Sequence, residues 1–342
     1  MKIAVVGAGV CGLAAAKTLA CRGHNVTLYE QFDLFHDRGS SHGASRIVRR
    51  AYSDPFYTAC MAEAYPLWAE LEAESSRKLV REVGLVYFGS RDAENIQSVA
   101  KGLADLSVPF EPLDRIKIQR VFPQLRLVDQ EIGIWTPEAG WVHAANALKA
   151  IYDVGIQAGL NVLTGHPADP FVLAKENDVV VVAAGAWTTL YAKLPVNVTL
   201  QTFAYVDAQV EGPVWIEDST NQPYGFPSDE DGLKMGIHRA GKAIDPESDG
   251  REPDHVFLDA ILRTAEYRFG LQSPSLSKPK TCLYTTTANE DFLLGNLAPN
   301  IFFASACSGH GFKMGPWIGK LLADFAEGKD CPENHPRFRY SA

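Results

Sequence analysis

The chain has 342 residues, of which 46% are hydrophobic and 21% are charged, a composition that excludes a mainly disordered protein. Its 32 basic and 41 acidic side chains give a formal net charge of −9, which argues against nucleic acid or an anionic membrane as a partner. The six cysteines are too few for a disulfide framework. Because none of them forms a Cys-x-x-Cys pair, we expect no metal site.

The first 30 residues have the pattern of a strand, a glycine-rich turn, a helix and a second strand. Residues 3–6 are apolar and β-branched, residues 13–20 are rich in alanine and leucine, and residues 26–29 lead into Glu30. This order predicts a βαβ unit at the start of the chain.

The rest of the chain alternates between predicted helices and strands. Helices are predicted over residues 54–78, 92–106, 141–158, 252–269 and 315–326. Pro66 is expected to kink the first of these helices or to split it in two. Strands are predicted over residues 84–89, 160–163, 178–184, 202–210, 232–238, 282–287 and 301–304.

These elements predict a mixed α/β (α+β) fold with one discontinuous domain. The run 178–184 has the apolar pattern of a buried parallel strand, whereas residues 202–238 have that of antiparallel strands. We therefore predict a Rossmann-like domain with an antiparallel-sheet domain inserted into it. The first is assigned residues 1–85, 140–195 and 280–342, and the second residues 86–139 and 196–279.

The sequence also bears on where the protein acts. The longest apolar run, residues 179–187, is too short to span a bilayer. The sequence shows neither a signal-peptide pattern nor a C-terminal Ser-Lys-Leu. We therefore expect a cytoplasmic protein.

Residues 7–12, Gly-Ala-Gly-Val-Cys-Gly, match the G-x-G-x-x-G pattern of dinucleotide-binding turns. Gly7 permits the tight turn, Gly9 lets a pyrophosphate approach the backbone, and Gly12 lets helix and strand pack closely. Glu30, at the end of the second strand, is placed to accept the hydroxyls of a ribose. The motif predicts a dinucleotide site but does not separate FAD from NAD.

Two further segments combine basic residues with glycine. Residues 41–52 contain Arg46, Arg49 and Arg50, which form either a solvated face or a site for an anion. In residues 232–238, strand alternation places Lys234 and His238 on one face together with two glycines. That face is either exposed to water or open to a ligand that lies against the backbone.

The C-terminal third holds two more candidates. Cys282, taken by itself, has the character of a buried small hydrophobic residue. Residues 308–313, Ser-Gly-His-Gly-Phe-Lys, form a turn between a strand and a helix. Ligands of open α/β sheets bind at such turns, so this segment is predicted to be a ligand loop.

Taken in this order, the motifs resemble those of the monomeric sarcosine oxidase and N-methyltryptophan oxidase family, FAD-dependent amine oxidases of the DAO type. The resemblance covers nearly the whole chain. Its most specific parts are Ser-His-Gly-x-x-Arg-x-x-Arg, Tyr-Gly-Phe-Pro with Gly-Leu-Lys-x-Gly-x-His, Cys-x-Tyr-Thr and Ser-Gly-His-Gly-Phe-Lys. The chain also departs from the family in places. Residues 164–178 leave no room for the usual pair of strands, Ala44 and Ser45 replace residues that are often more polar or bulkier, and Arg50 adds a charge without an assigned role. The chain is also shorter than most members.

The resemblance implies specific roles for residues of this chain. FAD is expected to be attached covalently to Cys282, Lys234 to help activate oxygen, and Arg49 with Lys313 to bind a substrate carboxylate. Covalent attachment requires a thiolate, hence an accessible cysteine in a polar site. The substrate pocket is expected to include Tyr224 and His238. The expected cofactor contacts are Gly7, Gly9, Gly12, Glu30, His42, Arg46, Gly185, Cys282, Gly309, Gly311 and Lys313.

The resemblance implies an oxidase of a secondary or N-methyl amino acid, in which a hydride passes to flavin N5, the imine is hydrolysed and O₂ becomes H₂O₂. One alternative is a dehydrogenase or imine-forming tailoring enzyme that acts on a bulkier amine with another acceptor, and a second is a flavin-binding protein without turnover. A monomer is expected. The sequence does not decide which of four aromatic residues line the pocket for the substrate side chain: Phe203, Tyr205, Trp215 or Tyr224.

Overall fold

The structure is a computed structural model that describes residues 1–238 and 241–340. A six-stranded sheet contains the predicted βαβ unit, in the order β17-β18-β10-β1-β2-β9. Its strands are β1 (Lys2–Val6), β2 (Asn25–Tyr29), β9 (Asn161–Leu163), β10 (Val179–Val182), β17 (Leu293–Ala298) and β18 (Ile301–Ser305). All pairings are parallel except that of β17 with β18. The four valines of β10 are buried, as the apolar run predicted.

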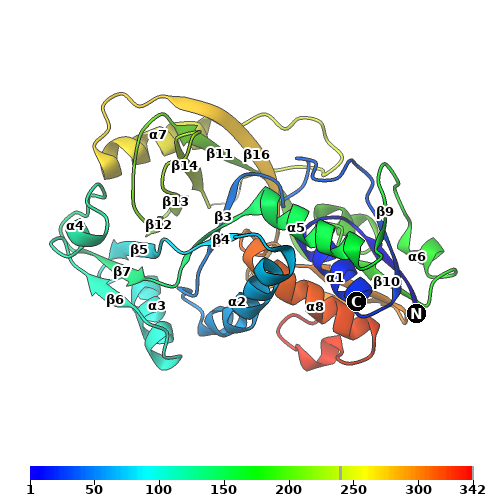
Figure 1. Cartoon of the computed structure of the whole chain (residues 1–342). Helices are drawn as coiled ribbons and strands as arrows, with labels where there is room; N and C mark the ends of the chain where they lie inside the picture. Colours follow the sequence, from blue (N-terminus) through cyan, green and yellow to red (C-terminus); the bar gives the residue numbers. More distant parts are fainter. Residues whose placement is uncertain (239–240, 341–342) are drawn as a thin grey trace.

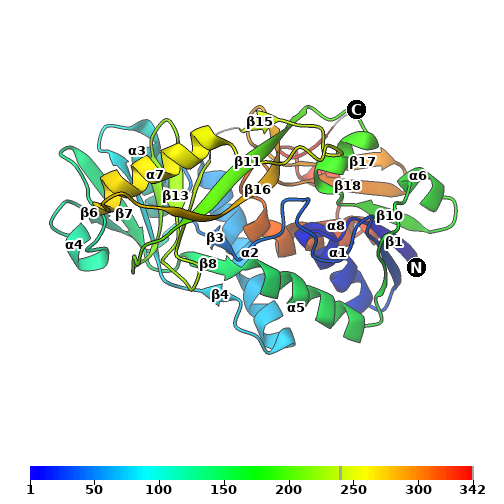
Figure 2. The same cartoon turned by 90° about the horizontal axis from the view of Figure 1, so that it is seen from above.

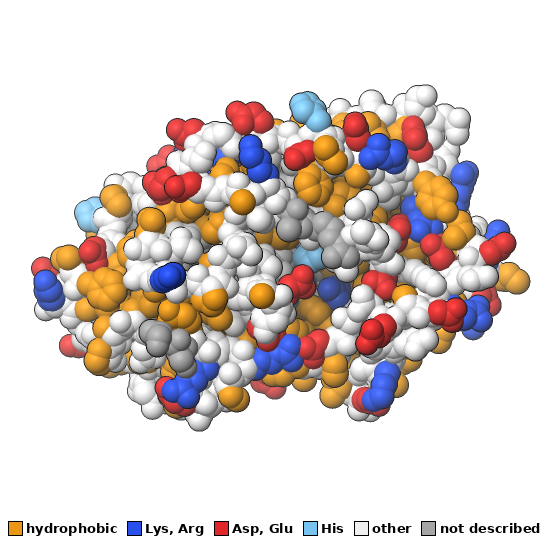
Figure 3. Space-filling view, turned by 180° about the vertical axis from the view of Figure 1, so that it is seen from behind, with side chains coloured by type: hydrophobic (Ala, Val, Ile, Leu, Met, Phe, Trp, Pro, Cys, Tyr) orange, Lys and Arg blue, Asp and Glu red, His pale blue; other side chains and the backbone are white. Residues whose placement is uncertain are grey.

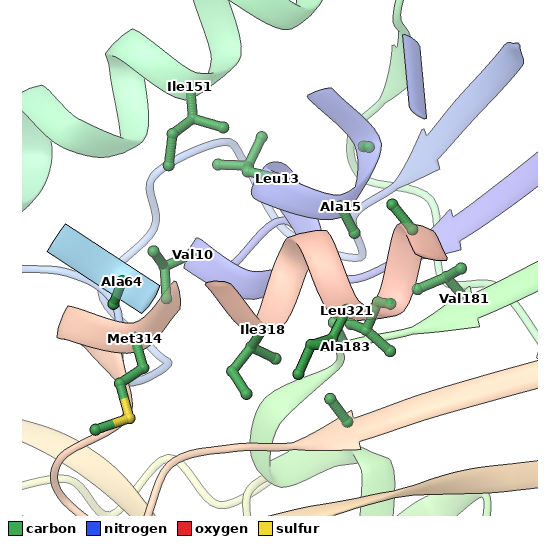
Figure 4. Packing of buried hydrophobic residues seen from close by; sticks show 14 of the residues in the cluster. Val10, Leu13, Ala15, Ala64, Ile151, Val181, Ala183, Met314, Ile318 and Leu321 are labelled. Carbon is green, nitrogen blue, oxygen red and sulfur yellow. The ribbon is translucent and has the colours of Figure 1, made fainter. Parts of the chain in front are cut away.

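Three helices cover one face of this sheet: α1 (Val10–Cys21), α5 (Ala144–Gln157) and α8 (Gly315–Ala326) (Figure 1). Figure 4 shows Val10 and Leu13 of α1 packed between Ile318 of α8 and Ile151 of α5. Glycines of α8 allow this close contact. A Cβ at Gly319 would lie 2.4 Å from the Cβ of Ala14, so larger residues would push the helices apart.

A nine-stranded sheet forms the other half of the molecule, in the order β15-β11-β14-β13-β12-β5-β7-β6, with β16 paired to β11. Its strands are β5 (Leu85–Ser90), β6 (Glu111–Leu113), β7 (Glu131–Thr136), β11 (Val196–Val206), β12 (Val214–Asp218), β13 (Pro223–Gly225), β14 (Leu233–Ile237), β15 (Lys242–Ala243) and β16 (Leu276–Thr287). Helix α7 (His255–Phe269) packs on its outer face. The long strands β11 and β16 run between the two halves in Figure 2.

The remaining described elements join these halves. A small antiparallel sheet consists of β3 (Ser45–Val48), β8 (Gly140–His143) and β4 (Val80–Arg81). Helices α2 (Pro55–Ser75) and α3 (Glu94–Asp105) lie beside it, and α4 (Ile118–Val121) is a single turn. Between β9 and β10 the chain forms helix α6 (Pro170–Leu173) and no strand, as the shortness of this link predicted.

The mixed α/β fold is confirmed, and some predicted elements need correction. Residues 140–143 form β8 rather than the start of a helix, because they pair with β3. Pro66 does not split α2, which continues through it. The predicted domain division stays a prediction, and its limit at residue 280 falls inside β16. No helix within the described residues is both long and apolar enough to cross a membrane.

Candidate active site

A cavity of about 430 Å³ lies where the two large sheets meet, a volume typical of small-molecule sites. It is lined by the turn after β1, by the ends of β2, β10 and β18, and by β11, β13, β14 and β16. Figure 3 shows one face of the molecule with a hollow near its centre, in which basic and histidine side chains are visible. The carboxyl ends of the parallel strands open into this cavity, as they do in other open α/β sheets.

The turn from β1 to α1 forms one end of the cavity. Gly7 has φ +100°, and a Cβ there would lie 2.6 Å from the carbonyl oxygen of Ala183, so only glycine fits. A Cβ at Gly12 would lie 1.9 Å from the carbonyl oxygen of Gly7. Gly12 therefore permits close packing and does not itself line the cavity. Gly9 carries no side chain that caps α1. The backbone N–H of Val10 donates to Ser41 Oγ at 3.1 Å, and the other N–H groups of the first turn are placed to bind a phosphate.

Glu30 is buried beside this turn, at the carboxyl end of β2. Its carboxylate accepts hydrogen bonds from the backbone N–H groups of Ala8 (2.8 Å) and Phe32 (3.0 Å). These two donors fix the carboxylate at the cavity wall while leaving acceptor positions free for the hydroxyls of a ribose. The glycine turn and the carboxylate together fit the phosphate and ribose groups of a dinucleotide.

His42 and Arg46 line the middle of the cavity. The Arg46 guanidinium donates hydrogen bonds to the carbonyl oxygens of Ser45 (2.9 Å), Ser40 (2.8 Å) and His42. Burial and the charge of Arg46 lower the pKa of His42 to about 4, so the imidazole is neutral at pH 7. Its buried Nε2 has no hydrogen-bond partner among the described residues, which fits a wall that a cofactor covers.

Lys234 projects from β14 into the cavity between two aromatic rings. Its Nζ lies 4.8 Å from the ring centroid of Phe203 and 4.9 Å from that of Phe226. It donates to the carbonyl oxygen (2.9 Å) and Oγ (3.2 Å) of Ser45. Burial, assisted by the charge of Arg46, lowers the pKa of Lys234 well below its usual value. An anion formed beside it would raise that pKa again.

Cys282 lines the cavity from β16 and is largely covered by neighbouring residues, and the expectation of an accessible thiol in a polar site stays a prediction. The residue is 8% exposed and packs against Phe203 and Tyr205. Burial raises the pKa of its thiol, and the guanidinium of Arg46 opposes this increase. The strand pairing of β11 with β16 places Cys282 opposite Gln201 and thus fixes it in the cavity wall.

Arg49 and Lys313 meet at a single aromatic ring. The guanidinium carbon of Arg49 lies 4.0 Å, and Nζ of Lys313 5.6 Å, from the centroid of Tyr52. Lys313 Nζ donates to the carbonyl oxygen of His310 at 2.8 Å. Burial and then the charge of Arg49 lower the pKa of Lys313 well below its usual value. Two cations that face one cavity in this way form a site for a carboxylate.

Tyr224, His238 and Tyr284 also line the cavity. Burial raises the pKa of Tyr224 to about 12, so its hydroxyl stays protonated. The ring of His238 lies 5.7 Å from that of Tyr284. A Cβ at Gly236 would lie 2.5 Å from the Tyr224 hydroxyl, so this glycine makes room for the tyrosine.

The structure therefore brings together the predicted site residues, apart from Gly12. Gly185, Gly309 and Gly311 also line the cavity. Of the four candidates for the side-chain pocket, Phe203 and Tyr224 line it. Trp215 was a wrong candidate, because it is buried on the opposite face of the sheet, and Tyr205 is not among the lining residues. Sequence reasoning missed Tyr52, Phe226 and Tyr284, although all three stand inside motifs that it quoted, and it also missed Tyr87 and Ile216.

Comparisons with known proteins agree with this geometry. Residues 2–325 match the family described as DAO, FAD dependent oxidoreductase. The chain belongs to this family. It is 31% identical to human peroxisomal sarcosine oxidase, over 94% of this chain and 91% of that protein. It is 27% identical to N-methyl-L-tryptophan oxidase of Yersinia pestis, over 96% and 95% of the two chains.

Solved structures show the same fold. The open form of NikD, described as an unusual amino acid oxidase essential for nikkomycin biosynthesis, matches with a TM-score of 0.85 and 25% identity, over 98% of this chain and 96% of NikD. L-proline dehydrogenase from P. horikoshii matches with a TM-score of 0.83 at 20% identity, over 96% and 94% of the chains. The chain is thus a FAD-dependent oxidoreductase related to sarcosine and N-methyl amino acid oxidases.

Proposed function

We propose that this member of the DAO family is an oxidase of a secondary or N-methyl amino acid that uses O₂ as its electron acceptor. The observation that carries this proposal is the pair of cations on Tyr52, because no carboxylate of the described residues lies within ion-pair distance of Arg49 or Lys313. Buried cations without an anion are costly. A substrate carboxylate would therefore bind here and fix the rest of the molecule in the cavity.

The names of the relatives support the substrate class. The human relative is named for sarcosine and the Yersinia relative for N-methyl-L-tryptophan. Both compounds are amino acids with a secondary amine. They share the carboxylate and the N–CH group, which are the parts that the cation pair and the neighbouring cavity would hold.

Other residues that line the cavity suit an oxidation. When bound, FAD would accept a hydride from the carbon next to the amine nitrogen and deliver electrons to O₂. Overall the amine loses two hydrogen atoms to O₂, which gives an imine and H₂O₂, and water hydrolyses the imine. Lys234, held by Ser45, would lower the free energy of an anion formed from O₂. Tyr224 and His238 would border the substrate on the far side of the cation pair.

Three finer features belong to the same proposal. Cys282 is the proposed covalent attachment point of FAD, since its thiol lies in the cavity wall. A monomer is proposed because bacterial relatives are named monomeric sarcosine oxidases. The expected cytoplasmic location stays a prediction.

The test uses the purified holoenzyme with sarcosine and a panel of N-methyl amino acids. Anaerobic mixing should bleach the flavin absorbance, and in air one H₂O₂ should form for each amine consumed. Bleaching without peroxide, with turnover only when an artificial acceptor is added, would favour the dehydrogenase alternative. If no amine bleaches the flavin, the proposal is wrong and a flavin-binding protein without turnover remains.

A further inference from the structure

The cavity continues past Tyr224 along β5 and β12. It is lined there by Tyr87 and Ile216 and reaches Asn95 at the start of α3. In this parallel pair Tyr87 lies opposite Ile216, and Gly89 lies opposite Asp218. Because side chains alternate along a strand, Ile216 and Asp218 lie on the same face of β12, which is the cavity face.

Asp218 is not itself a lining residue, but it contacts the lining residue Asn95 and lies near the lining residue Tyr87. We call these three residues the mouth cluster. Asn95 Nδ2 donates to Oδ1 of Asp218 at 3.0 Å. Burial and then the nearby carboxylate of Asp218 raise the pKa of the Tyr87 phenol. The phenol therefore keeps its proton. Gly89, opposite Asp218, adds no side chain that would fill the space.

Within the mouth cluster the carboxylate of Asp218 accepts a hydrogen bond from the neutral amide of Asn95. Asp218 is half-buried and forms no ion pair among the residues that the structure describes. An ionised carboxylate has about four acceptor positions, so the bond from Asn95 leaves room for a ligand group. A half-buried negative charge favours a positive group beside it over a neutral one.

The two ends of this compartment therefore carry opposite charges. Arg49 lies close enough to Tyr87 for its charge to oppose the increase in the pKa of Tyr87. A carboxylate held by Arg49 and Lys313 would thus place a side chain along Tyr87 and Ile216 toward Asp218. The walls between the two ends are aromatic and aliphatic, which suits the methylene groups of an unbranched side chain.

We propose that Asp218 is a specificity-determining residue, and that the enzyme acts on secondary amino acids whose long side chain ends in a cation. This inference rests on the proposed function for the position of the substrate carboxylate. The same geometry disfavours a side chain that ends in a second carboxylate, because like charges repel. It also leaves the short substrate sarcosine outside the reach of the mouth cluster.

The first test compares three substrates of similar length: Nα-methyl-lysine, N-methyl-norleucine and N-methyl-2-aminoadipate. The wild-type holoenzyme should rank their kcat/KM in that order, with sarcosine as the reference within each protein. In D218N the preference for Nα-methyl-lysine over N-methyl-norleucine should fall about tenfold, the scale of one ion pair in a partly buried site. The matched control is D105N, at the far end of α3, which should keep the wild-type ranking.

A binding measurement separates this inference from the proposed function. Calorimetry compares the affinity for ω-amino carboxylates of four to six carbons with the affinity for the matching fatty acids. Neither kind of compound reacts. An advantage for the amino compounds that D218N abolishes would support Asp218 even if no amine were oxidised. An unchanged preference in D218N, in either measurement, would overturn the inference. A failure of every amine to bleach the flavin, with the binding preference intact, would overturn only the proposed function.

Discussion

Arg49 and Lys313 come from distant parts of the chain and lie against the same ring. Arg49 follows β3, and Lys313 precedes α8. Their charged groups lie 4.0 Å and 5.6 Å from the centroid of Tyr52. Lys313 is buried and Arg49 is half-buried, and two such cations near each other oppose folding unless an anion or an aromatic ring compensates them. The ring provides part of this compensation, and a bound carboxylate would provide the rest.

Removal of either cation should weaken substrate binding. We expect R49M and K313M each to raise KM about a hundredfold, because an unpaired carboxylate in a buried site costs about 3 kcal/mol. The measurement is steady-state kinetics at matched flavin content. The control is R50M, since Arg50 lies outside the cavity wall and contacts Glu138 and Tyr65. Equal KM values in all three variants would contradict the assigned carboxylate site.

The affinity for carboxylates should depend on pH through Lys313. Burial and the charge of Arg49 hold the pKa of Lys313 well below its usual value. Only the protonated form attracts a carboxylate, so affinity should be full below this lowered pKa and should fall as pH rises through it. The measurement is the Kd of hexanoate across pH, because hexanoate has no amine that titrates in the same range. The pH dependence should disappear in K313M. A dependence that persists in this variant would have to come from another group.

Lys234 should act on the reaction with O₂ rather than on the reaction with the amine. Its Nζ lies between Phe203 and Phe226 and is held by Ser45. We expect K234M to slow the reaction of the reduced enzyme with O₂ about a hundredfold, the scale of one lost electrostatic contact to a developing anion. Stopped-flow measurements separate this rate from anaerobic reduction by the amine. The control is K280M, on the exposed part of β16. A normal rate with O₂ in K234M would rule out oxygen activation by this lysine.

Short-range patterns in the sequence predicted much of the site. The alternation of β14 correctly placed Lys234 on the opposite face from Leu233 and Met235, which are buried in the outer core. The spacing of two within a strand is a local property, so it needs no knowledge of the partner strands. The glycine turn and Glu30 were predictable for the same reason, because their spacing is fixed by one βαβ unit.

The parts that could not be predicted depend on contacts between distant segments. Trp215 and Ile216 are neighbours in the chain, yet one is buried in the outer core and the other lines the cavity. Which of them faces the substrate is set by the pairing of β12 with β5. The helix predicted over residues 141–158 begins too early for a similar reason, since the pairing of residues 141–143 with β3 overrides their local preference. Asp218 has no signal in its own neighbourhood of the sequence.

Attachment of FAD to Cys282 should depend on the ionisation of a buried thiol. The thiolate is the nucleophile, and burial raises the pKa of Cys282 while Arg46 opposes that increase. Covalent incorporation of FAD into the apoprotein should therefore become faster as pH rises, and R46M should slow it at neutral pH. Acid precipitation measures the outcome, since attached flavin stays in the pellet. C282A should release all of its flavin into the supernatant.

The matched control is C307A, which removes the thiol of Cys307, another residue that lines the cavity. This variant should retain the yellow pellet. If C307A instead releases the flavin and C282A retains it, Cys307 is the attachment point and the assignment from the Cys-x-Tyr-Thr motif is wrong.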